Sequence, residues 1–210
     1  MWKFRSLRVK TLWVLALLLG AMGSLGILTS AALLGRSLER FEQQAAEQQF
    51  ARVEAAFARD VAARLRTVVD YAAWDEAARH LSQPGGDFIA KSFTLESMRN
   101  TRIDAAAFFG RDGRFHSGVQ ALPQGVAGLD RDGPLVRGIE ALLRDPALQT
   151  IPPGGAEFKR WLAGQPLLLV LSPVRPTAAG SASVGSAVMV QTLGPDYLAE
   201  LGRSTGATLR

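Results

Sequence analysis

The first pattern along the chain is a long apolar stretch followed by a long amphipathic one. Residues 11–35 carry no charged side chain, and 25 residues in a helix span about 37 Å, more than the roughly 30 Å of a bilayer core. From Phe50 to Ala72 apolar residues then recur every three or four positions, and no proline or glycine interrupts the run. This spacing predicts a transmembrane helix over 11–35 and a long stalk helix over 37–82.

The remainder, residues 83–210, has the pattern of an α+β domain. Asp112-Gly113 separates two apolar runs and predicts a hairpin turn, because such turns need positive φ at their central positions. Leu167 to Leu171 is apolar at every position, as expected of a strand covered on both faces. The other expected elements are helical stretches at 87–99, 135–143 and 195–201, strands at 103–109, 115–119, 157–163, 165–174 and 184–193, and an irregular connection at 122–133. We expect about five antiparallel strands with helices packed on them.

The basic residues before the apolar stretch set the expected topology. Four basic and no acidic residues lie in the first ten positions, which predicts a cytoplasmic tail at 1–10 and an extracytoplasmic part at 36–210. The chain is therefore expected in the bacterial inner membrane as a single-pass protein, with its bulk in the periplasm. A cleavable signal peptide is the alternative, since Thr29-Ser30-Ala31 offers small residues at a cleavage site. The apolar stretch is, however, longer than the usual signal core.

Charge and cysteine content exclude several classes of function. The chain has 24 basic and 19 acidic residues, a net charge of +5. Since four of the basic residues lie in the tail, the part at 36–210 has 20 basic and 19 acidic residues and is nearly neutral. A nearly neutral domain argues against binding nucleic acid. The sequence has no cysteine, which excludes disulfides, thiol nucleophiles and thiolate metal sites.

The candidate binding residues lie in DYAAWDEAARHL, residues 70–81. On a continuous helix, Tyr71, Trp74 and Asp75 would share one face, with Asp70 one turn before Trp74. A carboxylate beside an indole can receive an amine or a polar ligand, so we take these four residues as candidate ligand-binding residues. The alternative is structural: Trp74 anchors the core and Asp75 caps or bonds a loop.

This cluster resembles the signature of the fourth class of CHASE domains, the extracellular sensory modules of bacterial cyclases, phosphodiesterases and histidine kinases. The matching residues are Asp70, Ala72, Trp74, Asp75 and Glu76. Ala78 stands where the family usually has tyrosine. With the later Tyr197-Leu198 and Thr205-Gly206 pairs, the resemblance extends over residues 37–209.

The resemblance implies a PAS-like antiparallel sheet with packed helices and a sensory function. The ligand would be an unknown small molecule, or the partner a periplasmic protein. In the family a second membrane span and a cytoplasmic signalling region usually follow, so we expect residues 1–210 to be the N-terminal sensor part of a receptor, or a protein that has lost its output. The apolar stripe, too long for one domain to cover, predicts a homodimer through Leu38 to Leu65.

Enzyme chemistry finds little support in the sequence. Gly85-Gly86-Asp87-Phe88 looks like the signature of diguanylate cyclases, but the glutamate is missing. His80 and His116 are 36 positions apart without metal-binding spacing, so each is expected to be a lone surface or helix-end histidine. The chain offers no nucleophile and base in a known pattern. We expect no enzyme activity, cofactor or metal, and keep a partner-binding or structural envelope protein as the alternative function.

Overall fold

The computed structural model describes the chain in four stretches, and side chains at 7–9 and 28–42 lie outside the description. The described stretches are residues 7–83, 86–145, 151–178 and 181–207. The chain divides into two compact units, Met1–Arg52 and Val53–Arg210. Helix α1, Leu7–Ala72, begins in the first unit and ends in the second.

The first unit contains an apolar helical stretch that fits a membrane anchor. Within the described residues, Lys10–Ile27 is long and apolar enough to cross a membrane, and none of it is buried. Large side chains such as Trp13 and Leu17 are 65% and 70% exposed. Such a continuous apolar surface is unfavourable in water and favourable in lipid. The expectation of an N-terminal apolar helix is confirmed.

The predicted continuous helix over 37–82 is wrong at one point. Helix α1 ends at Ala72, Trp74 has extended backbone angles, and α2 begins anew as Asp75–Ser82. The loop after the fifth strand stabilises the break, because its backbone N–H groups bond to the carbonyl oxygen of Ala72 at 3.4 Å and to the carboxylate of Asp75 at 2.8 Å. Trp74 and Asp75 therefore do not share a helical face with Tyr71.

Two short helices replace the single helical stretch expected at 87–99. They are α3, Phe88–Ser92, and α4, Leu95–Thr101. Thr94 separates them as the N-cap of α4, where its hydroxyl accepts a hydrogen bond from the Ser97 N–H at 3.2 Å, a favourable cap. Helix α4 is followed by its C-cap residue Arg102, which has the left-handed angles φ 55° and ψ 46°.

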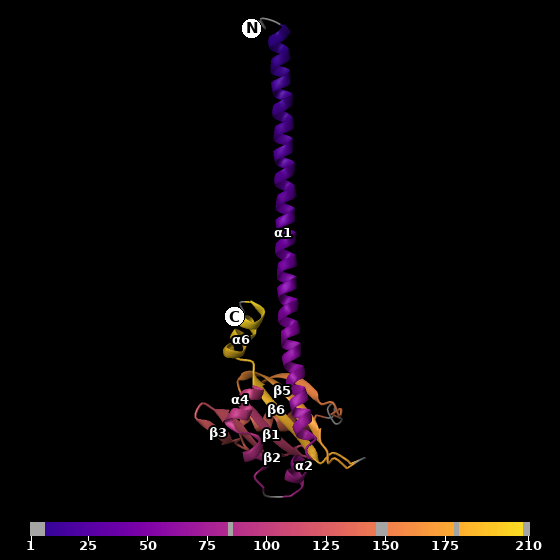
Figure 1. Ribbon diagram of the computed structural model, residues 1–210, viewed down its shortest axis with the longest axis vertical. Helices are drawn as coiled ribbons and strands as arrows, with labels where there is room; N and C mark the ends of the chain where they lie inside the picture. Colours follow the sequence, from indigo (N-terminus) through magenta and orange to yellow (C-terminus); the bar gives the residue numbers. More distant parts are fainter. Residues whose placement is uncertain (1–6, 84–85, 146–150, 179–180, 208–210) are drawn as a thin grey trace. The chain divides into compact units, whose positions relative to one another are not determined.

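In the described part of the chain the strands form one six-stranded sheet in the order β3-β2-β1-β6-β5-β4 (Figure 1). The strands are β1 Ala105–Gly110, β2 Phe115–Leu122, β3 Gly125–Gly128, β4 Ala156–Leu162, β5 Gln165–Val174 and β6 Gly185–Thr192. All neighbours are antiparallel. A turn at Asp112-Gly113 joins β1 to β2 as expected, but only Gly113 has positive φ, +72°, so the expected positive φ at both positions is wrong. Strand β3, in the stretch expected to be irregular, was not predicted.

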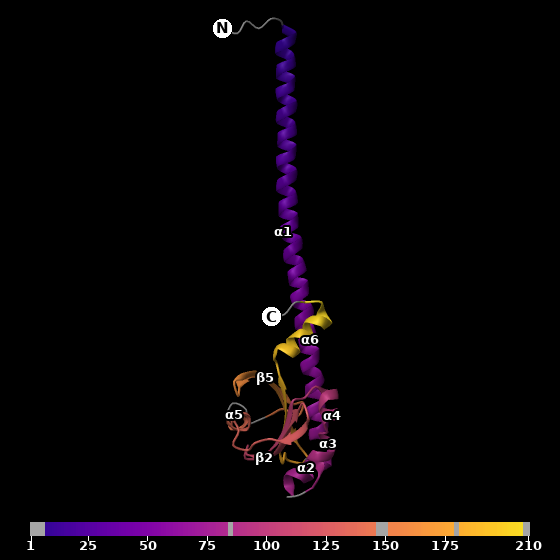
Figure 2. The same ribbon diagram turned by 90° about the vertical axis from the view of Figure 1, so that its left-hand side faces the viewer.

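The sheet is covered on both faces, as the apolar run of β5 predicts. The end of α1 and helices α2 to α4 lie on one face, and α5, Pro134–Leu143, lies on the other (Figure 2). Leu168 and Val170 belong to the first core, and Leu167, Leu169 and Leu171 to the second. After β6 comes α6, Pro195–Thr205. The α+β class is confirmed, and the PAS-like character stays a prediction.

Candidate functional site

Three stacked aromatic rings mark the end of α1. The ring of Trp74 stacks on Tyr71 with centroids 4.5 Å apart, and Tyr71 stacks on Phe93 at 5.0 Å. The Tyr71 hydroxyl donates a hydrogen bond to the carbonyl oxygen of Ser92 at 3.5 Å. Phe93 is buried and Trp74 is 38% exposed. The stack therefore fixes the orientation of the Trp74 ring and presents its outer face at the surface.

A cleft of about 500 Å³ opens between α2 and α3 beside this ring. Trp74, His80 and Phe88 contribute its aromatic surface. The two helices approach because Phe88 is buried in the core beneath them, with its ring 5.5 Å from that of Phe108 in β1. The cleft thus has an aromatic lining held by the sheet.

The rim of the cleft carries charges of both signs. Arg79 pairs with Glu76 on α2 at 2.8 Å, and Lys91 pairs with Asp87 beside α3 at 2.7 Å. The hydrogen bond from Lys91 lowers the pKa of Asp87. All four side chains are more than half exposed, and exposed pairs contribute little to stability. These groups are free to exchange their partners for charged groups of a ligand.

The two histidines, expected to be separate, lie close together, and one of them, His80, lines the cleft. Nε2 of His80 lies 2.6 Å from the Ser117 hydroxyl, and Nδ1 of His116 lies 3.2 Å from the same oxygen. The ring centroids of the two histidines are 4.9 Å apart. The expectation of two lone histidines is wrong. The fold brings His80 of α2 against His116 and Ser117 of β2, although the two histidines are 36 positions apart in the sequence.

The surroundings of His80 favour its neutral form. Its ring lies 5.4 Å from Phe88 and 5.9 Å from Phe108. Burial first, and then the charge of His116, lower the pKa of His80. Within the described residues its buried Nδ1 has no hydrogen-bond partner. No spacing in the sequence indicates a role for His80 or Phe88, since their neighbours come from strands far along the chain.

The four predicted site residues take different places. Trp74 lines the cleft, and Tyr71 stacks behind it. The carboxylate of Asp75 accepts a hydrogen bond from the backbone N–H of Thr177 at 2.8 Å, which lowers the pKa of Asp75. Asp70 is exposed on the last turn of α1. Tyr71 and Trp74 come together, and the two carboxylates lie outside the set of cleft-lining residues.

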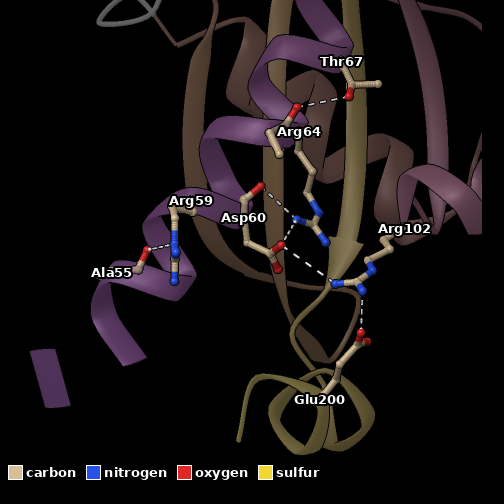
Figure 3. A network of polar contacts seen from close by, with 8 residues as sticks. Ala55, Arg59, Asp60, Arg64, Thr67, Arg102 and Glu200 are labelled. Carbon is tan, nitrogen blue, oxygen red and sulfur yellow. Dashed lines mark hydrogen bonds and ion pairs between the residues drawn. The ribbon is translucent and has the colours of Figure 1, made fainter. Parts of the chain in front are cut away.

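A polar cluster joins the domain's first helix to its last (Figure 3). Arg102 lies 2.6 Å from Glu200 of α6 and 4.0 Å from Asp60 of α1. Asp60 also pairs with the buried Arg64 at 3.2 Å. Burial, followed by the charge of Asp60, raises the pKa of Tyr197 to about 12. Among the residues described, no group of three or more His, Asp or Glu side chains can hold a metal ion.

Comparison with known proteins places the chain in a family. The family model of the CHASE4 domain matches residues 56–210. A solved structure that matches is the extracellular domain of vpHK1S-Z8, a protein assigned as a histidine kinase, with 13% sequence identity and a TM-score of 0.39. The match covers 72% of this chain, which spans only 61% of that chain. No curated protein matches the sequence. Residues 56–210 show that the chain belongs to the CHASE4 family of extracellular sensory domains.

Proposed function

We propose that the chain is a membrane-anchored periplasmic sensor whose domain binds a small molecule in the cleft between α2 and α3. One observation carries this proposal: Trp74, the aromatic residue of the family signature, is both the outer ring of a fixed stack and a wall of the cleft. A volume of about 500 Å³ lies in the range of small-molecule sites. The domain itself is sensory and not catalytic.

The predicted site residues have different roles in this proposal. The exposed face of Trp74 contacts the ligand, and Tyr71 holds the ring in place. Asp75 holds the start of α2 through the N–H of Thr177, so that the cleft keeps its width. Asp70, exposed beside them, adds negative charge at the same end of the domain. Together with the rim charges, this favours an amphipathic ligand with an apolar part that stacks on Trp74.

Signalling follows from where the cleft lies along the chain. The break between Ala72 and Asp75 joins the ligand-binding helix α2 directly to the stalk helix α1. A ligand that binds one arrangement of α2 and α3 better than another shifts the population of that arrangement. The break is a small element able to absorb the change in backbone angles. Binding would in this way bias the packing of α1 in a homodimer.

A thermal screen of the full chain in detergent, followed by hydrogen exchange, tests the ligand site. A compound that binds the folded state raises the melting temperature in a concentration-dependent way. We expect slower exchange at residues 74–82 and 88–92. Slower hydrogen exchange found only outside residues 74–82 and 88–92 would rule out the cleft as the binding site.

The proposed orientation places residues 1–10 in the cytoplasm, 11–35 in the bilayer and 36–210 in the periplasm. Because the chain has no cysteine, a single cysteine introduced at Ser6 or at the exposed Ala182 can be labelled cleanly. A membrane-impermeant maleimide on spheroplasts should label only Ala182→Cys. Labelling of Ser6→Cys alone would show that the orientation is the opposite of the proposed one.

A partner-binding envelope protein is the second candidate function. Trp161, on the edge strand β4, is 71% exposed, and exposed tryptophans are enriched where proteins bind one another. Under this alternative, Trp161→Ala would abolish cross-linking to a periplasmic partner. Unchanged cross-linking would count against it.

A further inference from the structure

Helix α2 is joined to the rest of the domain by side-chain hydrogen bonds near both of its ends. At its start the carboxylate of Asp75 accepts a bond from the N–H of Thr177. Near its end His80 bonds to Ser117 of β2 at 2.6 Å. The helix has only eight residues and begins after a break in the backbone. Few contacts therefore decide whether α2 stays packed on the sheet.

The hydroxyl of Ser117 serves two imidazole rings at once. Nε2 of His80 and Nδ1 of His116 both lie within hydrogen-bond distance of its oxygen. A hydroxyl has one proton, so Ser117 donates to one ring nitrogen and accepts an N–H from the other. Two neutral rings satisfy this arrangement.

A second proton on His80 does not fit the packed position of α2. Protonation turns both ring nitrogens into donors. Among the described residues the buried Nδ1 of His80 has no partner, and the neighbouring rings of Phe88 and Phe108 provide no acceptor. A buried charged donor without an acceptor is unfavourable. The charged ring is therefore favoured only where Nδ1 reaches water.

The titratable and charged groups around His80 strengthen this preference. His116 faces it from β2 with ring centroids 4.9 Å apart, so a charge on one ring disfavours a charge on the other. Both effects, burial first, lower the pKa of His80. The charged side chains of α2 and α3 at the cleft are exposed and paired with one another, Arg79 with Glu76 and Lys91 with Asp87.

We propose that His80 is a pH-dependent latch, whose protonation releases α2 from β2 and opens the cleft between α2 and α3. The break between Ala72 and Asp75 allows α2 to move without unwinding α1. Acid favours the released form because the released ring takes up a proton more readily, and the effect disappears above about pH 6.5. Release depends on the chain alone, whereas its effect on signalling rests on the proposed function.

Hydrogen exchange of the full chain in detergent, without any ligand, tests the latch. At pH 5.5, one pH unit below the ordinary pKa of 6.5, protonation raises the ratio of released to packed α2 by up to about tenfold. His80→Gln can keep a hydrogen bond to Ser117 without titrating. We expect the exchange rate at residues 77–82, divided by the rate in His80→Gln, to rise by this factor between pH 7.5 and pH 5.5. An unchanged ratio would overturn the proposal.

Protection factors distinguish release of α2 from unfolding of the whole domain. At pH 5.5 the amides of α2 should be much less protected than those of β5 and β6, and low urea concentrations should change their exchange little, because a local opening exposes little surface. His116→Gln should retain most of the response to pH. Equal protection factors in α2 and β5 at pH 5.5 would mean that the whole domain opens, which contradicts a latch.

Nuclear magnetic resonance of ring-labelled histidine keeps the test valid if His80→Gln does not fold. The chain has two histidines, so His116→Gln assigns both ring signals. The ring of His80 should titrate below pH 6.5, and the acceleration of exchange in α2 should level off at that midpoint. If His80 takes up its proton while α2 keeps its protection factor, α2 stays packed and the latch is ruled out.

Discussion

At the scale of single residues, Trp74 and Asp75 are neighbours in the family signature but make different contacts. The indole stacks on Tyr71 and faces the cleft. The carboxylate of Asp75 is not part of the cleft lining and accepts a hydrogen bond from the N–H of Thr177. An acidic residue in the first turn also suits the N-terminus of α2. The signature thus combines the partly exposed ring of Trp74 with the hydrogen bond between Thr177 and Asp75 that holds the start of α2.

Two substitutions of Asp75 distinguish the effect of its negative charge on stability from the effect of its hydrogen bond to Thr177. Asp75→Asn keeps an oxygen that can accept the Thr177 N–H, so we expect a melting temperature within a few degrees of the parent. Asp75→Ala removes the acceptor, and hydrogen exchange at the Thr177 amide should accelerate. Equal exchange in the parent and the alanine variant would show that the bond does not hold the loop.

His80 should make stability depend on pH. Its pKa is lowered from 6.5 by burial and then by His116, so the unfolded chain takes up this proton at a higher pH than the folded chain does. Stability is therefore complete above about 6.5 and falls as the pH drops below that value, until folded His80 is protonated too. The groups facing His80 are His116, Ser117, Phe88 and Phe108.

Denaturation curves between pH 7.5 and about 5 measure this effect. His80→Gln can keep a hydrogen bond to Ser117 without titrating, and its stability should fall less steeply than that of the parent. His116→Gln removes only the smaller cause and should retain most of the dependence. If the free energy of unfolding fell equally steeply with decreasing pH in the parent and in His80→Gln, this account of His80 would be contradicted.

At the scale of elements, the bridge at Arg102 links α4 to α1 and α6. Arg102→Asn should keep the left-handed backbone, which asparagine tolerates, and remove the guanidinium. Because Arg102 and Glu200 are about half exposed, a double-mutant cycle with Glu200→Gln should give a coupling of about 0.2 to 1 kcal/mol. Hydrogen exchange in α6 should rise in both variants but not in Glu76→Gln, which breaks a surface pair on α2. No coupling and unchanged exchange would mean that the bridge is incidental.

Several elements could be predicted from local pattern, and others depended on distant partners. Strand β5 was predicted with its observed bounds, since Leu167 to Leu171 must be covered on both faces. The break at Trp74 was missed because no glycine or proline marks it, and the loop near Thr177 stabilises it. Strand β3 was missed because Gly125–Gly128 is short and pairs only with β2.

The candidate site was predicted only in its local part. Trp74 and Tyr71 are only three residues apart, so a contact between them was expected, although the rings stack across the break in the helix and not along a helical face. His80 and Phe88 became part of the cleft through α2, α3 and the sheet, which pack together only in the folded domain. No local pattern in the sequence fixes that packing.

At the scale of the whole molecule, the exposed part of α1 is the proposed dimer contact. Phe50 is 71% exposed, whereas Val61 and Val68 are buried in the domain and Phe57 packs against its core. Phe50→Glu should therefore abolish self-association, measured by sedimentation of the full chain in detergent, without lowering the melting temperature. Phe57→Glu should destabilise the domain instead. A monomeric parent chain would contradict the proposed dimer.

The most direct test of the central claim is calorimetric titration of a compound from the thermal screen into two matched tryptophan variants. Trp74 lines the cleft, and Trp161 lies on the edge strand β4, so both changes remove an exposed indole. We expect Trp74→Ala to weaken binding by about tenfold or more, as the loss of a stacking aromatic ring does. Trp161→Ala should bind as tightly as the parent. Unchanged binding in Trp74→Ala, or an equal loss in both variants, would contradict a ligand site in the cleft between α2 and α3.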